Sequence, residues 1–84
     1  MKPKTLREPE NINDIPEERI LHTLTKPRAH QSIVFVEDGE DPWFVEVKYY
    51  KTKTGEVTDS ETILGKEVDG WLKWLTNLKY EVKK

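Results

Sequence analysis

The feature that most constrains this fold is an amphipathic stripe close to the C-terminus. Its apolar members are Val68, Trp71, Leu72, Leu75 and Leu78. Because one α-helical turn takes about 3.6 residues, this spacing places the five side chains on one face of a helix. A helix of this length is not stable alone in water, so its apolar face must cover another apolar surface.

That other surface is predicted to be a β-sheet, because three runs of strand-forming residues precede the helix. Residues 32–36 are a continuous β-branched and aromatic run, typical of a central strand. Residues 44–50 alternate, so that Val45, Val47 and Tyr49, with Trp43 before them, share a core face. Thr54-Gly55 predicts a tight turn into residues 57–64, which are more polar and typical of an edge strand.

The N-terminal third is predicted to form a mobile tail and one short helix. Residues 1–13 are polar, contain two prolines and show no periodicity. Asp14 is a suitable N-cap, and Glu17 stands at the capping-box spacing from it. Ile20, Leu21 and Leu24 then share a helical face, and the helix ends before Pro27.

The predicted fold is therefore an α+β domain covering residues 14–84. It has a short N-terminal helix, a three-stranded antiparallel meander and a C-terminal amphipathic helix packed on one sheet face. Tyr80 and Val82 alternate with charged residues, which indicates a short extended segment after the helix. Because so short a chain builds only a small core, we expect a homodimer formed through sheet edges or the tryptophan-bearing helix.

Composition excludes several classes of function. There is no cysteine and there are two histidines, so neither a thiolate metal site nor a disulfide framework is expected. No glycine-rich phosphate loop or nucleophile–base pair is recognisable, so we expect no enzyme activity, no cofactor and no metal. No apolar run approaches about 18 residues and the start lacks a signal-peptide pattern, so a cytoplasmic protein is expected.

One candidate site lies on the central hairpin. Segment 43–54 carries three lysines against one glutamate in a chain whose formal charge is −2. Surfaces that bind single-stranded nucleic acid combine aromatic side chains for base stacking with basic side chains for phosphates. The candidate nucleic-acid-binding residues are Phe44, Lys48, Tyr50, Lys51 and Lys53. An equally weighted alternative is that Phe44 and Tyr50 fill a second small core under the N-terminal helix.

The same residues resemble a known family. Residues 45–50, the turn ending at residues 54–57, residues 62–64 and a helix bearing Trp71 are similar to the C-terminal domain of the transcriptional coactivator PC4 and its bacterial and phage relatives. The resemblance covers about half of the chain. It implies antiparallel strands followed by a helix, a homodimer, and single-stranded DNA binding in which Lys48 and Tyr50 make contacts. The chain departs from the family at residues 37–41, which carry four carboxylates that would repel phosphate.

A second interpretation is a protein-interaction module, such as a small accessory or inhibitor protein of phage type. The acidic segments 37–41 and 56–69 could engage a basic partner by charge complementarity. Trp74 stands at the margin of the helical stripe and, if exposed, would be an anchor for a protein interface. Ordinary partial burial of Trp74 at the edge of the stripe is the alternative to that role. Lys26, Arg28 and His30 form a separate small basic connector.

Overall fold

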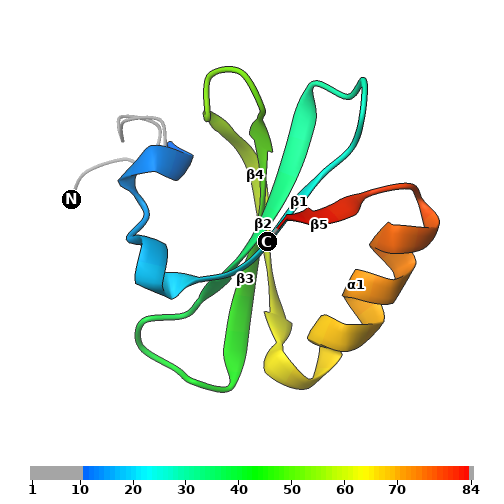
Figure 1. The fold of residues 1–84 in the computed structure, drawn as a ribbon. Helices are drawn as coiled ribbons and strands as arrows, with labels where there is room; N and C mark the ends of the chain where they lie inside the picture. Colours follow the sequence, from blue (N-terminus) through cyan, green and yellow to red (C-terminus); the bar gives the residue numbers. More distant parts are fainter. Residues whose placement is uncertain (1–10, 84) are drawn as a thin grey trace.

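The computed structural model describes residues 11–83 and shows one antiparallel sheet of five strands (Figure 1). The strands are β1 (Ile20–Thr25), β2 (Gln31–Glu37), β3 (Phe44–Lys51), β4 (Val57–Leu64) and β5 (Glu81–Lys83). Their order across the sheet is β4-β3-β2-β1-β5, so the first four form a meander and the last pairs with β1. The predicted α+β class is confirmed, but the sheet has five strands rather than three.

One face of the sheet is covered by the C-terminal helix α1 (Val68–Asn77), which follows the 3-10 turn η4 (Gly65–Glu67). Val68 and Leu75 of α1 pack against side chains from all four meander strands. Leu24, Phe35 and Val47 of this core have no exposed surface. Trp71 and Leu72 lie at its edge, partly buried. The predicted C-terminal helix and its packing on one sheet face are therefore confirmed.

The opposite face is crossed by residues 11–19, which lie on the other side of the sheet from α1 (Figure 1). This segment contains two 3-10 turns, η2 (Ile12–Asp14) and η3 (Glu17–Arg19). Ile12 and Ile15 pack against a smaller buried cluster formed by Val34, Val36 and Tyr50. Residues 11–13, which the sequence places in the tail, thus contribute to this layer, whereas residues 1–10 lie outside the described residues.

The prediction of a helix starting at Asp14 is wrong, because the segment that should continue it is strand β1. Leu24 faces the α1 core, while Ile20 packs on the opposite face. A bulge between Ile20 and His22 changes the register with β2. Apolar residues at positions 20, 21 and 24 fit a bulged strand as well as a helix, because a bulge shifts the alternation of side chains between the two faces. Thr23 and Thr25 are β-branched and favour a strand over a helix.

The connection between β2 and β3 is a loop of residues 38–43 rather than a tight turn. The Asp38 carboxylate accepts hydrogen bonds from the backbone N–H of Glu40 at 2.8 Å and of Asp41 at 3.3 Å. Gly39 does not adopt a positive φ, which in the described residues occurs at one glycine, Gly55. Trp43, predicted on the core face, lies in this loop with 75% of its surface exposed.

Among the described residues, no helix is long and apolar enough to cross a membrane.

Candidate nucleic-acid interface

Two turns that are far apart in sequence meet at one end of the sheet. The β1–β2 connection and the β3–β4 turn both lie at the upper end in Figure 1. The backbone N–H of Thr52 donates to the carbonyl of His30 at 2.9 Å, and the hydroxyls of Ser32 and Thr52 are 2.6 Å apart. The basic connector noted in the sequence is thereby placed beside the lysines of the central hairpin.

We call this region the basic end. It is formed by the basic side chains of the two turns, namely Lys26, Arg28, His30, Lys51 and Lys53. All except Lys26 are exposed. The one carboxylate within the two turns is Glu56, whose Oε1 lies 3.5 Å from Lys51 Nζ. The four permanent cations therefore outnumber the carboxylate, in a chain that is acidic overall.

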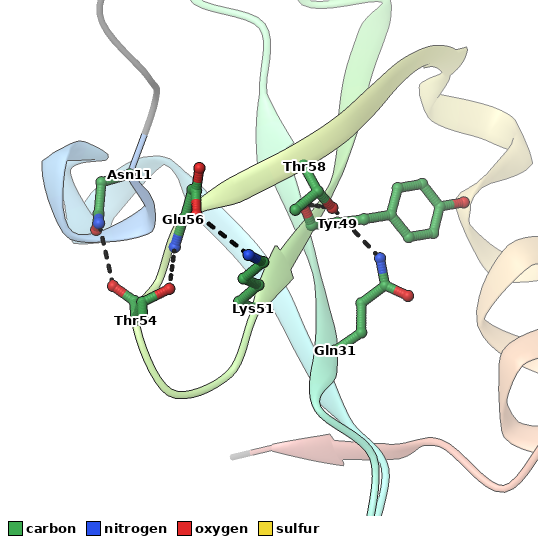
Figure 2. A network of polar contacts seen from close by, with 7 residues as sticks. All are labelled: Asn11, Gln31, Tyr49, Lys51, Thr54, Glu56 and Thr58. Atoms are coloured by element: carbon green, nitrogen blue, oxygen red, sulfur yellow. Dashed lines mark hydrogen bonds and ion pairs between the residues drawn. The ribbon is translucent and has the colours of Figure 1, made fainter.

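The β3–β4 turn is held by a network of polar contacts, drawn in Figure 2. The Asn11 side-chain amide donates to the Thr54 carbonyl at 3.1 Å, and the Thr54 hydroxyl accepts from the Glu56 N–H at 3.2 Å. The backbone N–H of Ile12 donates to the Gly55 carbonyl at 2.7 Å. These contacts tie the turn to the N-terminal segment, so Lys51 and Lys53 project from a fixed backbone.

Gly55 is required at this turn, and its replacement gives the first prediction. Its φ is +81°, and a Cβ atom there would lie 2.8 Å from Ile12 Cγ2 and 2.9 Å from Asn11 Oδ1. We expect Gly55→Ala to lower the free energy of unfolding by about 2 kcal/mol, through left-handed strain and this crowding. Urea denaturation checks it. Gly70→Ala is the matched control, because nothing lies within 4 Å of a Cβ built at Gly70. Because Gly70 lies in α1, its replacement by alanine should be neutral or stabilising, and a Gly55→Ala variant no less stable than Gly70→Ala would contradict the packed turn.

Two basic residues near this end adopt a left-handed backbone conformation, which favours glycine. Arg28 has φ of 68° and Lys79 has φ of 79°. Lys79 follows α1 at the position where helices commonly place glycine, and Tyr80 N–H donates to the Leu75 carbonyl at 3.1 Å. Lys26 Nζ lies 5.4 Å from the centre of the Tyr80 ring, so the turn between α1 and β5 lies next to the basic end. A left-handed non-glycine residue costs about 1–2 kcal/mol.

A hollow of about 760 Å³ opens beside the basic end, on the sheet face covered by residues 11–19. Its wall on the sheet side includes Tyr50, Thr52 and Lys53, and β5 contributes Lys83. Ile12 and Ile15 supply its apolar wall, and Glu17 is the acidic residue lining it. The volume lies in the range of small-ligand sites, and the lining combines hydroxyl, ammonium and aromatic groups.

Four of the five nucleic-acid-binding residues predicted from the sequence fall into three environments. Lys51 and Lys53 are exposed at the basic end. Tyr50 is 8% exposed and belongs to the small core as well as to the wall of the hollow. Phe44 is partly buried near the opposite end of β3, next to Trp43. The alternative interpretation, in which these aromatic residues fill a second small core, therefore applies to Tyr50. The segment that covers this core consists of 3-10 turns rather than the expected N-terminal helix.

Lys48 is buried rather than displayed on a wet sheet face. The residue is 6% exposed, and its Nζ lies 3.4 Å from Glu46 Oε1. Its neighbour Tyr49 faces the α1 side, where burial and the nearby Glu61 carboxylate raise the pKa of its hydroxyl to about 12. Neither side chain presents its polar group at the basic end.

The protein-interaction residue predicted from the sequence, Trp74, is 54% exposed on α1. It makes an edge-to-face contact with Trp71, with ring centres 5.8 Å apart.

Sequence reasoning missed the contribution of Lys83 to the hollow, because the pairing of β5 with β1 is a long-range event. It identified the connector carrying Arg28 but could not place it beside the hairpin.

Fold and site together define a small antiparallel α+β domain with a basic, partly hollowed end. Comparison with protein-family models, curated proteins and solved structures found no match for this chain.

Proposed function

We propose that this protein binds single-stranded nucleic acid at the basic end. The observation that carries the proposal is the junction of two turns through the Thr52–His30 hydrogen bond, which gathers four permanent cations at one end of the sheet. Phosphate groups supply most of the affinity of nucleic acids for proteins, and lysine and arginine are their usual partners. The protein acts as a binding module and not as an enzyme.

The hollow beside the basic end favours a single strand over a duplex. A flexible strand can place its backbone along Lys51 and Lys53 while a base or sugar enters the space bounded by Tyr50 and Thr52. Thr52 and Thr54 offer hydroxyl groups for sugar or phosphate oxygens. A rigid duplex would meet the exposed lysines but could not insert a nucleotide.

The left-handed backbone at Arg28 and Lys79 supports the same assignment. Glycine would relieve the strain at either position, yet both hold long cationic side chains. A helix C-terminus also favours a cation, which accounts for part of the preference at Lys79. Arg28 lies in the β1–β2 connection, where no helix contributes such an effect.

The test is a titration of a labelled oligothymidylate at several salt concentrations. If about four phosphates are neutralised, the logarithm of the association constant should fall with a slope of about −3 against the logarithm of salt concentration. A duplex of the same length should bind at least about tenfold more weakly. Binding that does not depend on salt, or equal affinity for both forms, would contradict the proposal.

The resemblance to PC4-like domains and the homodimer both remain predictions. A meander followed by a helix is the element order that the resemblance implies, and β4 and β5 are the edges of the described sheet. β4 exposes Asp59 and Glu61 along that edge, which disfavours indiscriminate pairing of strands. Sedimentation of the full chain, with and without the oligonucleotide, measures the oligomeric state.

A further inference from the structure

A tryptophan is displayed at the end of the sheet opposite the basic end. The Trp43 residue is 75% exposed, although its backbone N–H and its backbone carbonyl are both hydrogen-bonded. Its N–H donates to the Asp41 carboxylate at 3.0 Å, and its carbonyl accepts from the Gly65 N–H at 2.7 Å. A large apolar side chain held in water on a rigid backbone contributes little to folding. Tryptophan is among the residues most often found as anchors of protein interfaces.

The surroundings of Trp43 form two adjoining hollows, each with tryptophan in its wall, that share Lys66. A hollow of about 640 Å³ is lined by Pro42, Trp43, Phe44 and Leu64, together with Gly65 and Lys66. Lys66 also lines a second hollow, of about 440 Å³, whose wall includes Trp71 and Trp74. We call these two hollows together the tryptophan surface. It joins the loop before β3 to the outer side of α1.

Carboxylates border the tryptophan surface. The loop leading into Trp43 carries Asp38, Glu40 and Asp41, and Glu37 precedes it at the end of β2. Asp38 and Asp41 stabilise the loop through backbone hydrogen bonds, while Glu37 and Glu40 are exposed. Arg19 reaches this loop, but its Nη2 donates to the Glu37 carbonyl at 2.7 Å rather than to a carboxylate. The four carboxylates outnumber Arg19 and Lys66, the two cations beside them, so the border is negative on balance, which disfavours phosphate backbones and favours cations.

We propose that the tryptophan surface binds a segment of a partner protein in which an apolar side chain is flanked by lysine or arginine. The apolar side chain would occupy the hollow beside Trp43, and the cations would face Glu37 and Glu40. The site lies at the opposite end of the sheet from the basic end, so it is separate from the proposed nucleic-acid site. The protein would then connect a nucleic acid to a basic protein.

A second copy of this chain fits the surface less well. The large apolar residues that are exposed among the described residues are Leu21, Trp43, Trp74, Leu78 and Val82, and none belongs to the two turns of the basic end. The basic end of another copy therefore lacks an anchor for the hollow. Symmetric pairing of two tryptophan surfaces would bring two acidic loops together, which electrostatic repulsion disfavours.

The experiment uses two synthetic peptides without tryptophan, which share one leucine-phenylalanine centre and carry either lysine or glutamate flanks. Binding to the full chain is followed by isothermal titration calorimetry, a readout that does not depend on Trp43. We expect the lysine-flanked peptide to bind at least about tenfold more tightly. Trp43→Ala should weaken that binding at least about tenfold, and Glu40→Lys should weaken it several-fold. Val82→Ala, which also truncates an exposed apolar side chain, should leave it unchanged.

Equal affinity for the two peptides, or no binding of either at millimolar concentration, would overturn the proposal. So would retention of full affinity by Trp43→Ala when circular dichroism shows that the variant is folded. Concentration-dependent association in sedimentation that Trp43→Ala abolishes would assign the surface to a second copy and would also overturn it. Oligothymidylate affinity should be unchanged in Trp43→Ala, so failure of this proposal and failure of the nucleic-acid proposal are distinguishable.

Discussion

Phe35→Ala is expected to lower the free energy of unfolding by about 3–5 kcal/mol. Phe35 has no exposed surface and lies on β2, the central strand of the sheet. Its ring makes edge-to-face contacts with His22 on one side and Trp71 on the other, at centroid distances of 6.1 and 6.5 Å. Removing it leaves a cavity between the sheet and α1. For a domain of this size, such a loss is a large part of a total stability of about 4–13 kcal/mol.

Urea denaturation followed by circular dichroism measures this loss. Phe35→Leu keeps most of the volume and should cost under about 1.5 kcal/mol. Trp71→Ala should cost less than Phe35→Ala, because Trp71 is partly exposed at the edge of the same core. A loss below about 1 kcal/mol at Phe35, or the reverse order of the two alanine variants, would mean that α1 does not cover this face as the structure shows.

The part of the fold that the sequence predicts correctly is the part governed by local periodicity. The stripe from Val68 to Leu75 specifies a helix, and the alternation of Val45 and Val47 specifies a strand facing it. The region of residues 14–25 was predicted wrongly because its apolar spacing suits both a short helix and a bulged strand. Pairing with the next strand, β2, and with β5 near the C-terminus decides between the two, and the second of these pairings is long-range in sequence.

The candidate site was predicted in part for a similar reason. Lys51 and Lys53 were identified because they follow a strand and stand beside a turn glycine. The alternation of side chains along the strand groups Lys48 with them. Alternation shows on which face of the strand a residue lies, but it does not show which other segment covers that face. The N-terminal segment covers much of this face, and the burial of Tyr50 beneath it depends on contacts with residues such as Ile12 and Ile15. The junction of the two turns rests on the Thr52–His30 hydrogen bond, for which no local sequence signal exists.

Reversing both exposed hairpin lysines is expected to abolish binding of single-stranded nucleic acid. Lys51→Glu with Lys53→Glu replaces two of the four permanent cations of the basic end by carboxylates. We expect affinity for oligothymidylate to fall at least about 100-fold at low salt, and the salt slope to decrease by about 1.4 for two lost phosphate contacts. Lys48 is unsuitable for this test, because a carboxylate buried beside Glu46 would destabilise the fold.

The matched control reverses two exposed lysines away from the basic end, Lys66 and Lys73. It changes the net charge by the same amount, so any effect of overall charge appears in both double variants. We expect the control to lose less than about threefold in affinity, because exposed charges farther apart than the Debye length of about 8–10 Å are largely screened. Both variants should retain their thermal midpoint within a few degrees, since exposed lysines contribute little to stability. Equal loss of affinity in the two double variants would show that binding follows net charge rather than the geometry of the basic end.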